Sequence, residues 1–386
     1  MTQSKYTFKI ISSFILIFTT LLFISCTDDP EVNPDNLVSD DSNANTLSDS
    51  TETNTDSLSL GNSNENTLGT FSSGVFVINE GNFLSDDGSI SFIDSEGVVQ
   101  NNIFSENNAS LPLGDVVQSM YVNDTTAFIL VNNSNKVEVV NVNEMKLLHT
   151  ISVVSLPRYM ISDGDYGYIS EWVSFSDPGR ISILDLHTYE ILDTINVGFG
   201  AEALAIRNNK LYVSNNFENT LSVINLSTRE IIQTIPVGPS PSAMVIDKND
   251  YLWIVCSGGY NEDYSLANNG LLVQLDANDK VLKEISLEMN VGGKLVTNVD
   301  SSILYFYSGT TVYSYDLGDE SHNTFIENTS AISFYGIGVS PDGDIYIADS
   351  RSFQSLGSVY IYDHTGQEQA VFEVGRGPNG FVFTSD

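Results

Sequence analysis

The chain has few cysteines, few histidines and few basic residues. Its 386 residues include two Cys, four His and 15 Lys plus Arg, against 50 Asp plus Glu. Cys26 follows the apolar N-terminal stretch. Cys256 is then the only thiol left, which excludes an internal disulfide. Cys256 lies in the apolar run YLWIVCS, which favours a small buried hydrophobe over a nucleophile.

The motifs of common catalytic and metal-binding sites are absent as well. The sequence contains no HExxH, no CxxC and no glycine-rich phosphate loop. The acidic residues Glu80, Glu202 and Asp349 show no metal-ligand spacing, and none of the histidines falls in the loops considered below as a binding face. We therefore expect a protein that is not an enzyme, with no catalytic residue, metal or cofactor.

The apolar stretch near the N-terminus is too short to span a membrane. Residues 10–24 are interrupted by Ser and Thr, and a spanning helix needs roughly 20 apolar residues. The stretch follows Lys5 and Lys9 and ends in FISC, a pattern that indicates a signal peptide over residues 1–25. FISC resembles a bacterial lipoprotein box, which implies lipidation of Cys26. An ordinary secretory signal is the alternative, and both predict an exported protein.

Residues 26–70 have the composition of a disordered linker after the lipidated cysteine. Residues 27–70 hold ten acids and no Lys or Arg, with many Ser, Thr and Asn, so they cannot bury enough apolar surface to fold. The acids in CTDDP resemble the surface-export signal of some Gram-negative lipoproteins. This resemblance implies a lipid anchor in the outer membrane, with the protein facing the cell exterior.

The rest of the chain, residues 71–386, is strongly acidic. It carries 40 acids against 13 Lys plus Arg. Such a surface repels nucleic acids and anionic lipid headgroups, which excludes a nucleic-acid partner. Solubility at a crowded cell surface is the simplest explanation of the charge.

A pair of apolar strands recurs seven times in this part of the chain. The first strands are GVFVINE (74), TAFILVN (126), YGYISEW (166), KLYVSNN (210), YLWIVCS (251), ILYFYSG (303) and DIYIADS (344). The second strands close at Asp94, Asn141, Asp185, Asn225, Asp276, Asp316 and Asp363. A period of roughly 40–50 residues is typical of the four-stranded blades of a β-propeller. Inner strands such as AEALAIRN and outer strands such as EIIQTIPV complete the units.

The two ends of the repeat array predict how the propeller closes. The first unit, residues 74–104, has no inner strand before it, whereas NGFVFTSD (379–386) has the pattern of an inner strand and nothing after it. Pairing of this last strand with the first blade would remove the exposed edges of an open sheet. We therefore expect residues 71–386 to form one all-β domain, a seven-bladed β-propeller closed by its C-terminal strand.

The connections between strands should differ on the two faces of this propeller. Loops from the second to the third strand of a blade, and from the fourth strand to the next blade, share one face, which we call the loop-rich face. Tight turns such as DKND and SPDGD lie on the opposite face, the hairpin face. On the loop-rich face residues 171–180, 257–270 and 349–357 are long, whereas NNSN is minimal. Uneven lengthening on one face indicates a binding site.

Aromatic, basic and amide side chains in these loops suit a sizeable, partly apolar ligand. The candidate binding residues are Asn82, Phe83, Asn133, Arg158, Trp172, Phe175, Phe217, Tyr260, Tyr264, Arg351 and Phe353. Arg180, Asn216 and Asn268 are expected on the same face. For each ring taken singly, packing against its own loop is the alternative, but as a set the rings favour a binding face.

Several longer segments resemble known propellers. LYVSNNFENTLSVINLSTREIIQTIPVG resembles the YVTN-type repeat, which indicates architecture only. More specific are VINEGN (77–82), NSNKVEVVN (133–141), RYM (158–160), VGFGAEALAIRNNKLYVSN (197–215) and YGIGVSPDGDIYIADSRSF (335–353). With the lipoprotein box and the acidic linker, they resemble the surface vitamin-B12-binding lipoproteins, which are seven-bladed propellers placed over an outer-membrane, TonB-dependent cobalamin transporter.

This resemblance implies that the protein captures cobalamin and delivers it to such a transporter. Trp172 and Tyr260 would then flank the corrin, Asn82 and Asn133 would pair with its amides, and Arg158 or Arg351 would meet its phosphate. No histidine need bind the cobalt, since DLHTYE lacks the glycine of the cobalamin-ligating DxHxxG pattern. A surface propeller that binds a glycan or a protein partner without catalysis is the alternative.

Overall fold

The computed structural model describes residues 71–261, 263 and 265–384. The signal peptide, the lipidated Cys26 and the linker predicted for residues 1–70 lie outside the described residues, as does the candidate Tyr264.

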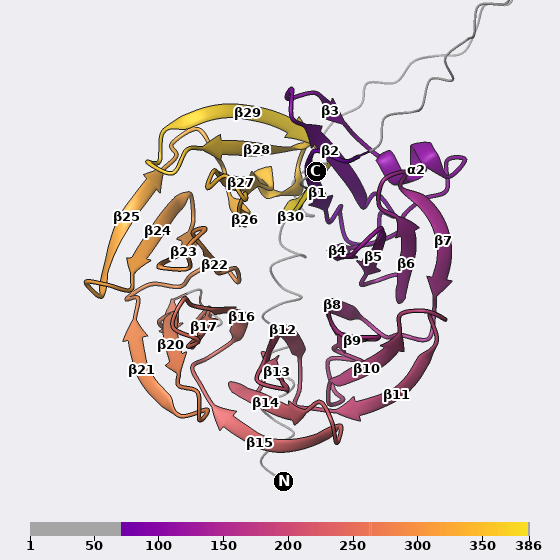
Figure 1. Cartoon of the computed structure of the whole chain (residues 1–386). Helices are drawn as coiled ribbons and strands as arrows, with labels where there is room; N and C mark the ends of the chain where they lie inside the picture. The colour runs from indigo at the N-terminus through magenta and orange to yellow at the C-terminus, as the bar shows by residue number, and fades with distance from the viewer. Residues whose placement is uncertain (1–70, 262, 264, 385–386) are drawn as a thin grey trace, which may run out of the picture. The chain divides into compact units, whose positions relative to one another are not determined.

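Within the described residues the strands form seven antiparallel sheets of four strands each, arranged around a common axis (Figure 1). The predicted all-β, seven-bladed propeller is therefore confirmed. Each blade places one strand beside the axis, two strands in the middle and one at the outside.

The strands are given from the inner to the outer position of each blade. Blade 1 has β30 (Pro378–Thr384), β1 (Gly74–Asn79), β2 (Ser89–Asp94) and β3 (Val99–Gln100). Blade 2 has β4 (Val117–Asn123), β5 (Thr126–Val131), β6 (Lys136–Asn141) and β7 (Lys146–Ile151). Blade 3 has β8 (Pro157–Asp163), β9 (Tyr166–Glu171), β10 (Arg180–Asp185) and β11 (Ile191–Asn196). Blade 4 has β12 (Ala201–Arg207), β13 (Lys210–Asn215), β14 (Thr220–Asn225) and β15 (Glu230–Pro236).

The remaining blades follow the same order. Blade 5 has β16 (Pro241–Ile246), β17 (Leu252–Cys256), β20 (Leu271–Leu275) and β21 (Val281–Ser286). Blade 6 has β22 (Val296–Thr297), β23 (Ile303–Ser308), β24 (Thr311–Asp316) and β25 (Ser321–Glu327). Blade 7 has β26 (Phe334–Val339), β27 (Ile345–Asp349), β28 (Gly357–Tyr362) and β29 (Glu368–Val374).

The middle strands are buried on both faces because each blade packs between two neighbours. Residues 127–131 of β5 and 211–215 of β13 are all buried, whereas β15 at the outside of blade 4 is exposed at every position except Ile235. Burial on both faces explains why the middle strands read as continuous apolar runs. Among the described residues, seven hydrophobic clusters each join one pair of neighbouring blades, including blades 7 and 1.

The ring closes through the C-terminal strand. β30 pairs antiparallel with β1, with Phe381 opposite Val77 and Thr384 opposite Gly74. The side chains of Phe381 and Phe383 pack with the cluster that joins blades 7 and 1. The predicted closure is confirmed, and the inner edge of blade 1 is paired as in the other blades.

Four short elements lie in the connections between the strands of the blades. α2 (Ile103–Asn107) lies between blades 1 and 2 and buries Ile103 and Phe104. β18 (Gly259–Tyr260) and β19 (Leu266–Asn268) form a two-stranded hairpin in the long loop of blade 5, and η1 (Arg351–Phe353) lies in the loop of blade 7. In the part of the chain that the structure describes, no helix has the length and apolarity needed to cross a membrane.

Candidate ligand-binding site

The inner strands carry β-bulges at the end that meets the loop-rich face. In β4, for example, Val117 pairs with Val131 and Ser119 with Leu130, so Gln118 is the extra residue. Register shifts at the same place occur in five other inner strands. The residues without a directly paired partner there are Arg158 and Tyr159 in β8, Glu202 and Ala203 in β12, Ser242 in β16, Tyr335 in β26 and Asn379 in β30. A bulge re-aims side chains out of the regular pleat. Neighbouring blades thereby bring polar side chains together near the axis.

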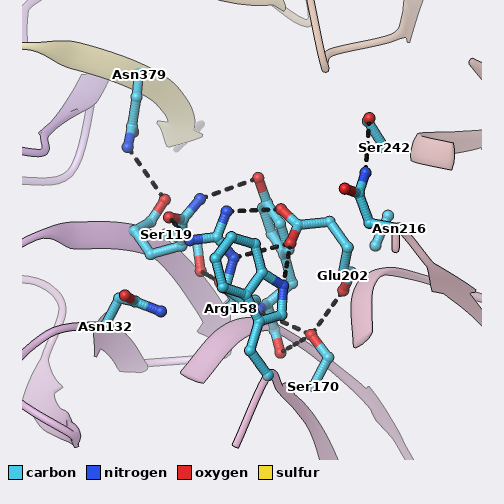
Figure 2. A network of polar contacts seen from close by, with 12 residues as sticks. Ser119, Asn132, Arg158, Ser170, Glu202, Asn216, Ser242 and Asn379 are labelled. Atoms are coloured by element: carbon cyan, nitrogen blue, oxygen red, sulfur yellow. Dashed lines mark hydrogen bonds and ion pairs between the residues drawn. The ribbon is translucent and has the colours of Figure 1, made fainter. Parts of the chain in front are cut away.

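Arg158 and Glu202 form the centre of this polar network (Figure 2). Nε and Nη2 of Arg158 each donate to a different carboxylate oxygen of Glu202, both at 2.8 Å. Nη1 donates to the side-chain oxygen of Gln118. Both charged side chains are largely buried. Burial alone would lower the pKa of Arg158, but the adjoining Glu202 carboxylate outweighs this effect and the pKa is raised, so the guanidinium stays charged.

Trp172 is fixed on the same ion pair. Its indole Nε1 donates to Glu202 at 2.7 Å, and the Arg158 guanidinium lies 4.0 Å from the centre of the ring. Phe217 from the next blade lies 5.0 Å from Trp172 and Phe175 lies 5.7 Å from it, measured between ring centres. Phe175 is 47% exposed, whereas Trp172 and Phe217 are half-buried. The three rings form one aromatic cluster on blades 3 and 4, beside the network.

The network extends across the axis. The Tyr159 hydroxyl of blade 3 accepts a hydrogen bond from Lys294 of blade 6 at 2.9 Å and another from Gln118 at 3.2 Å. Asn379 donates to Glu80 at 3.4 Å. Burial raises the pKa of Glu80, and a hydrogen bond with Tyr335 offsets part of the rise. A ligand on the loop-rich face would therefore meet aromatic rings beside a network of polar side chains that are hydrogen-bonded between blades.

The candidates on blades 1 and 2 lie around Asp87 and Asp115. The backbone N–H of Asn82 donates to Asp87 at 2.6 Å, and the Asn133 amide donates to Asp115 at 2.5 Å. Phe83 is exposed. Asn133 thus keeps only part of its hydrogen-bonding capacity for a ligand.

The remaining candidates lie on blades 5 and 7. Tyr260 is 60% exposed in the β18–β19 hairpin. Phe353 packs 5.2 Å from the Tyr335 ring, between ring centres, and Arg351 lies 3.9 Å from Glu373. Arg180 is not free, since it pairs with buried Glu171 at 2.8 Å. The structure thus joins Arg158, Trp172, Phe175 and Phe217 into one cluster and distributes the other candidates over separate blades.

Sequence reasoning missed several members of the network, among them Gln118, Tyr159, Lys294, Asn379 and Glu202 as the partner of Arg158. A signal was present, because in five blades a polar residue near the start of the inner strand follows Gly or Pro within two positions, as in LPRY, GAEA, PSPSA, GGK and GPNG. The sequence did not indicate which of these residues from different blades contact one another.

Metal and thiol chemistry find little support in the described residues. They contain no group of three or more His, Cys, Asp or Glu that could hold a metal ion. Cys256 is fully buried, and burial raises the pKa of its thiol to about 12, which confirms it as a small core residue.

The comparisons with known proteins agree with the fold. Residues 73–383 match the family described as domain of unknown function DUF5074. The chain belongs to the DUF5074 family. No match is found among curated proteins.

Solved structures similar to this DUF5074 protein share its fold. A quinonprotein alcohol dehydrogenase-like protein from Bacteroides thetaiotaomicron has a TM-score of 0.64 at 15% identity, covering 81% of this chain and 79% of that chain. A functionally unknown protein from Desulfotomaculum acetoxidans has a TM-score of 0.63 at 10% identity, covering 81% and 99% of the two chains. At these identities the similarity establishes the fold alone.

Proposed function

We propose that this DUF5074 protein is a non-catalytic, surface-exposed lipoprotein that captures cobalamin on its loop-rich face and delivers it to a TonB-dependent outer-membrane transporter. The aromatic cluster of Trp172, Phe175 and Phe217 carries the proposal, because it combines exposed ring surface with a rigid polar neighbourhood. The ion pair of Arg158 with Glu202 fixes Trp172 before any ligand arrives, and pre-organisation lowers the entropic cost of binding.

Cobalamin matches this combination of groups. Its corrin rim and its base offer flat apolar surfaces to the rings, and its side-chain amides suit Asn82, Asn133 and Tyr260 around the rim. Arg158 uses three of its five N–H donors within the protein, so two remain for the ligand phosphate. Arg351, with a looser contact to Glu373, is the second candidate for the phosphate.

The proposed delivery to the transporter is supported by features of the sequence. The lipoprotein box at Cys26 and the acidic linker would keep the propeller tethered to the outer membrane, and the family resemblance supplies the transporter as the partner. Co-purification of the full-length protein with a TonB-dependent transporter, in the presence and absence of cyanocobalamin, tests this step.

Isothermal titration of the full-length protein with cyanocobalamin tests the capture step. We expect saturable binding, and we expect Phe175→Ala to weaken it at least about tenfold, as for an aromatic residue in a binding hot spot. Tyr166→Ala is the matched control, because Tyr166 is an aromatic residue at the opposite end of blade 3. Absence of both heat and thermal stabilisation would remove cobalamin as the ligand, and glycans or a protein partner would then be tested on the same variants.

A further inference from the structure

A cavity of about 270 Å³ lies between blades 5 and 6, toward the hairpin face and away from the aromatic cluster. Blade 5 contributes residues of the turn after β16, of the middle strands β17 and β20, and of the outer strand β21. Blade 6 contributes the end of β24 and the turn that follows it. The lining residues used below are Asp247, Trp253, Gln274, Lys283, Tyr315 and Glu320.

Two largely buried side chains present polar groups to this cavity without a hydrogen-bond partner in the protein. Gln274 is only 6% exposed and Tyr315 only 2% exposed. Among the described residues, neither the Gln274 amide nor the Tyr315 hydroxyl makes a hydrogen bond, although most other buried polar side chains do. Neither group is among the fully buried polar atoms that lack a partner, so both are accessible from the cavity. A ligand in the cavity would supply the missing hydrogen bonds.

The other polar side chains that line the cavity have partners within the protein. Trp253 donates from Nε1 to Asp247 at 2.8 Å, and its ring lies 5.5 Å from that of Tyr315. Lys283 and Glu320 form an ion pair at 2.5 Å that joins the two blades beside the cavity. The charged groups are thus already paired or hydrogen-bonded, while the neutral amide and hydroxyl are not. This arrangement favours a neutral ligand over an ion.

We propose that this cavity is a binding site for a neutral polyol of the size of one sugar ring. Such a ligand offers hydroxyl groups that both donate and accept, as the Gln274 amide and the Tyr315 hydroxyl require. Its C–H faces suit the aromatic and leucine walls around Trp253, Tyr315, Leu282 and Leu317. The volume is below the roughly 300–1,000 Å³ of sites for drug-sized molecules, which restricts the ligand to a single ring. This site is separate from the cobalamin site proposed above and does not depend on it.

Tryptophan fluorescence can report on binding in the cavity, because the chain has two tryptophans and only Trp253 lines the cavity. In the full-length Trp172→Phe variant, Trp253 is the only tryptophan left. Glucose, galactose, mannose and N-acetylglucosamine, as free sugars and as methyl glycosides, are titrated into this variant. We expect at least one of them to change the Trp253 emission in a saturable way. Binding of the methyl glycoside as well would identify the ligand as the end of a glycan chain, and binding of the free sugar alone would identify a monosaccharide.

Two further variants decide whether the response comes from this cavity. Gln274→Leu and Tyr315→Phe each remove one unpartnered group, and we expect each to weaken binding by about three- to tenfold, as for the loss of one hydrogen bond. Tyr313→Phe makes the same change two residues along β24 outside the cavity and should leave the affinity unchanged. A lack of response to every sugar, or equal affinities in all three variants, would overturn the proposal. Tyr315→Phe keeps the ring in the core, so it remains informative if Gln274→Leu does not fold.

Discussion

The same strands lead to both faces of this propeller, but the polar side chains at the two faces are organised differently. On the hairpin face the same hydrogen-bonded turn recurs in every blade. The side chain of the Asp or Asn at the end of the third strand, residue i, accepts hydrogen bonds from the backbone N–H of residue i+2 and from that of residue i+3 or i+4. The acceptors are Asp94, Asn141, Asp185, Asn225, Asp276, Asp316 and Asp363. Such turns specify the fold locally.

The loop-rich face shows no such repetition. The bulged position holds Gln118 in one blade, Arg158 and Tyr159 in the next, and Glu202 in the third. These side chains bond between blades rather than within a turn. Features shared by all blades therefore stabilise the propeller fold, and features that differ between blades are available for binding a ligand. The cavity between blades 5 and 6 is the exception on the hairpin side.

The largest effect should follow from breaking the ion pair on the loop-rich face. Glu202→Ala leaves the largely buried Arg158 guanidinium without its carboxylate and removes the acceptor of Trp172. We expect the free energy of unfolding to fall by about 3 kcal/mol, because an unpaired buried charge is costly. Chemical denaturation measures it.

The matched control breaks an exposed ion pair. Glu320→Ala separates Lys283 from its partner on the outer side of the propeller, where both side chains reach solvent. The loss should be at most about 1 kcal/mol. Equal losses in the two variants would contradict the assignment of the Arg158 pair as the structural centre of the loop-rich face.

A pair of glycine substitutions should give the next largest difference. Gly200 has a φ of +71°, and an added Cβ would lie 2.8 Å from the Phe217 ring. Gly164, in a turn of the hairpin face, has a φ of +57° and no atom within 4 Å of an added Cβ. Gly164→Ala should cost about 1 kcal/mol for the left-handed backbone alone, and Gly200→Ala about 2–3 kcal/mol, since the ring must also move.

Thermal or chemical denaturation of the two alanine variants gives this difference, and titration with cyanocobalamin adds a second readout. Displacement of Phe217 should weaken binding in Gly200→Ala, whereas Gly164→Ala should bind normally. Normal binding by a destabilised Gly200→Ala variant would exclude Phe217 from the ligand site.

Removal of one turn acceptor should have a smaller effect. Asn225 accepts hydrogen bonds from the backbone N–H groups of Ser227 and Thr228, each at 3.0 Å. Asn225→Ala should lower the free energy of unfolding by about 1 kcal/mol, as for the loss of a local hydrogen-bonded turn. Urea unfolding measures the loss. A change in cobalamin affinity in this variant would contradict the separation of the two faces.

The same contrast explains how much of the molecule could be predicted from the sequence. Strands and turns are local, so the apolar runs and the recurring Asp or Asn positions were sufficient to predict the blades and their closure by β30. The pairing of Arg158 with Glu202 joins residues 44 positions apart through a bulge, and no local pattern specifies it. Phe217, in the turn of blade 4, proves to pack between Gly200 and Trp172, so its role combines loop packing with the edge of the site.

The sequence carries one signal of the cavity. Gln274 interrupts the apolar strand LLVQLD, where a buried amide must find a partner. Recognising it as a site required the volume between two blades, since Tyr315 and Glu320 come from a different repeat. Contacts between repeats, rather than within them, are therefore where prediction from this sequence stops.

The smallest effect concerns acid stability of the hairpin face. The backbone N–H of Lys280 lowers the pKa of Asp276 below its ordinary value, and that of Thr188 does the same for Asp185. A carboxyl whose pKa is lower in the folded state stabilises the fold above its unfolded pKa of about 3.9 and loses this effect as the pH falls through the folded pKa. These turns should therefore leave the free energy of unfolding unchanged between pH 7 and about pH 5 and lower it below about pH 4.

Replacement of a turn aspartate by asparagine isolates this contribution. Asn141 and Asn225 occupy the same position in blades 2 and 4 and make the same backbone hydrogen bonds, so Asp276→Asn should keep the turn. Its free energy of unfolding should then fall less steeply with acid than that of the parent protein. The parent should be the more stable of the two at neutral pH, and the two should converge below about pH 4. Urea unfolding over a series of pH values measures both slopes. Identical slopes would mean that the Asp276 carboxylate contributes no acid sensitivity and that the hairpin face relies on hydrogen-bond geometry alone.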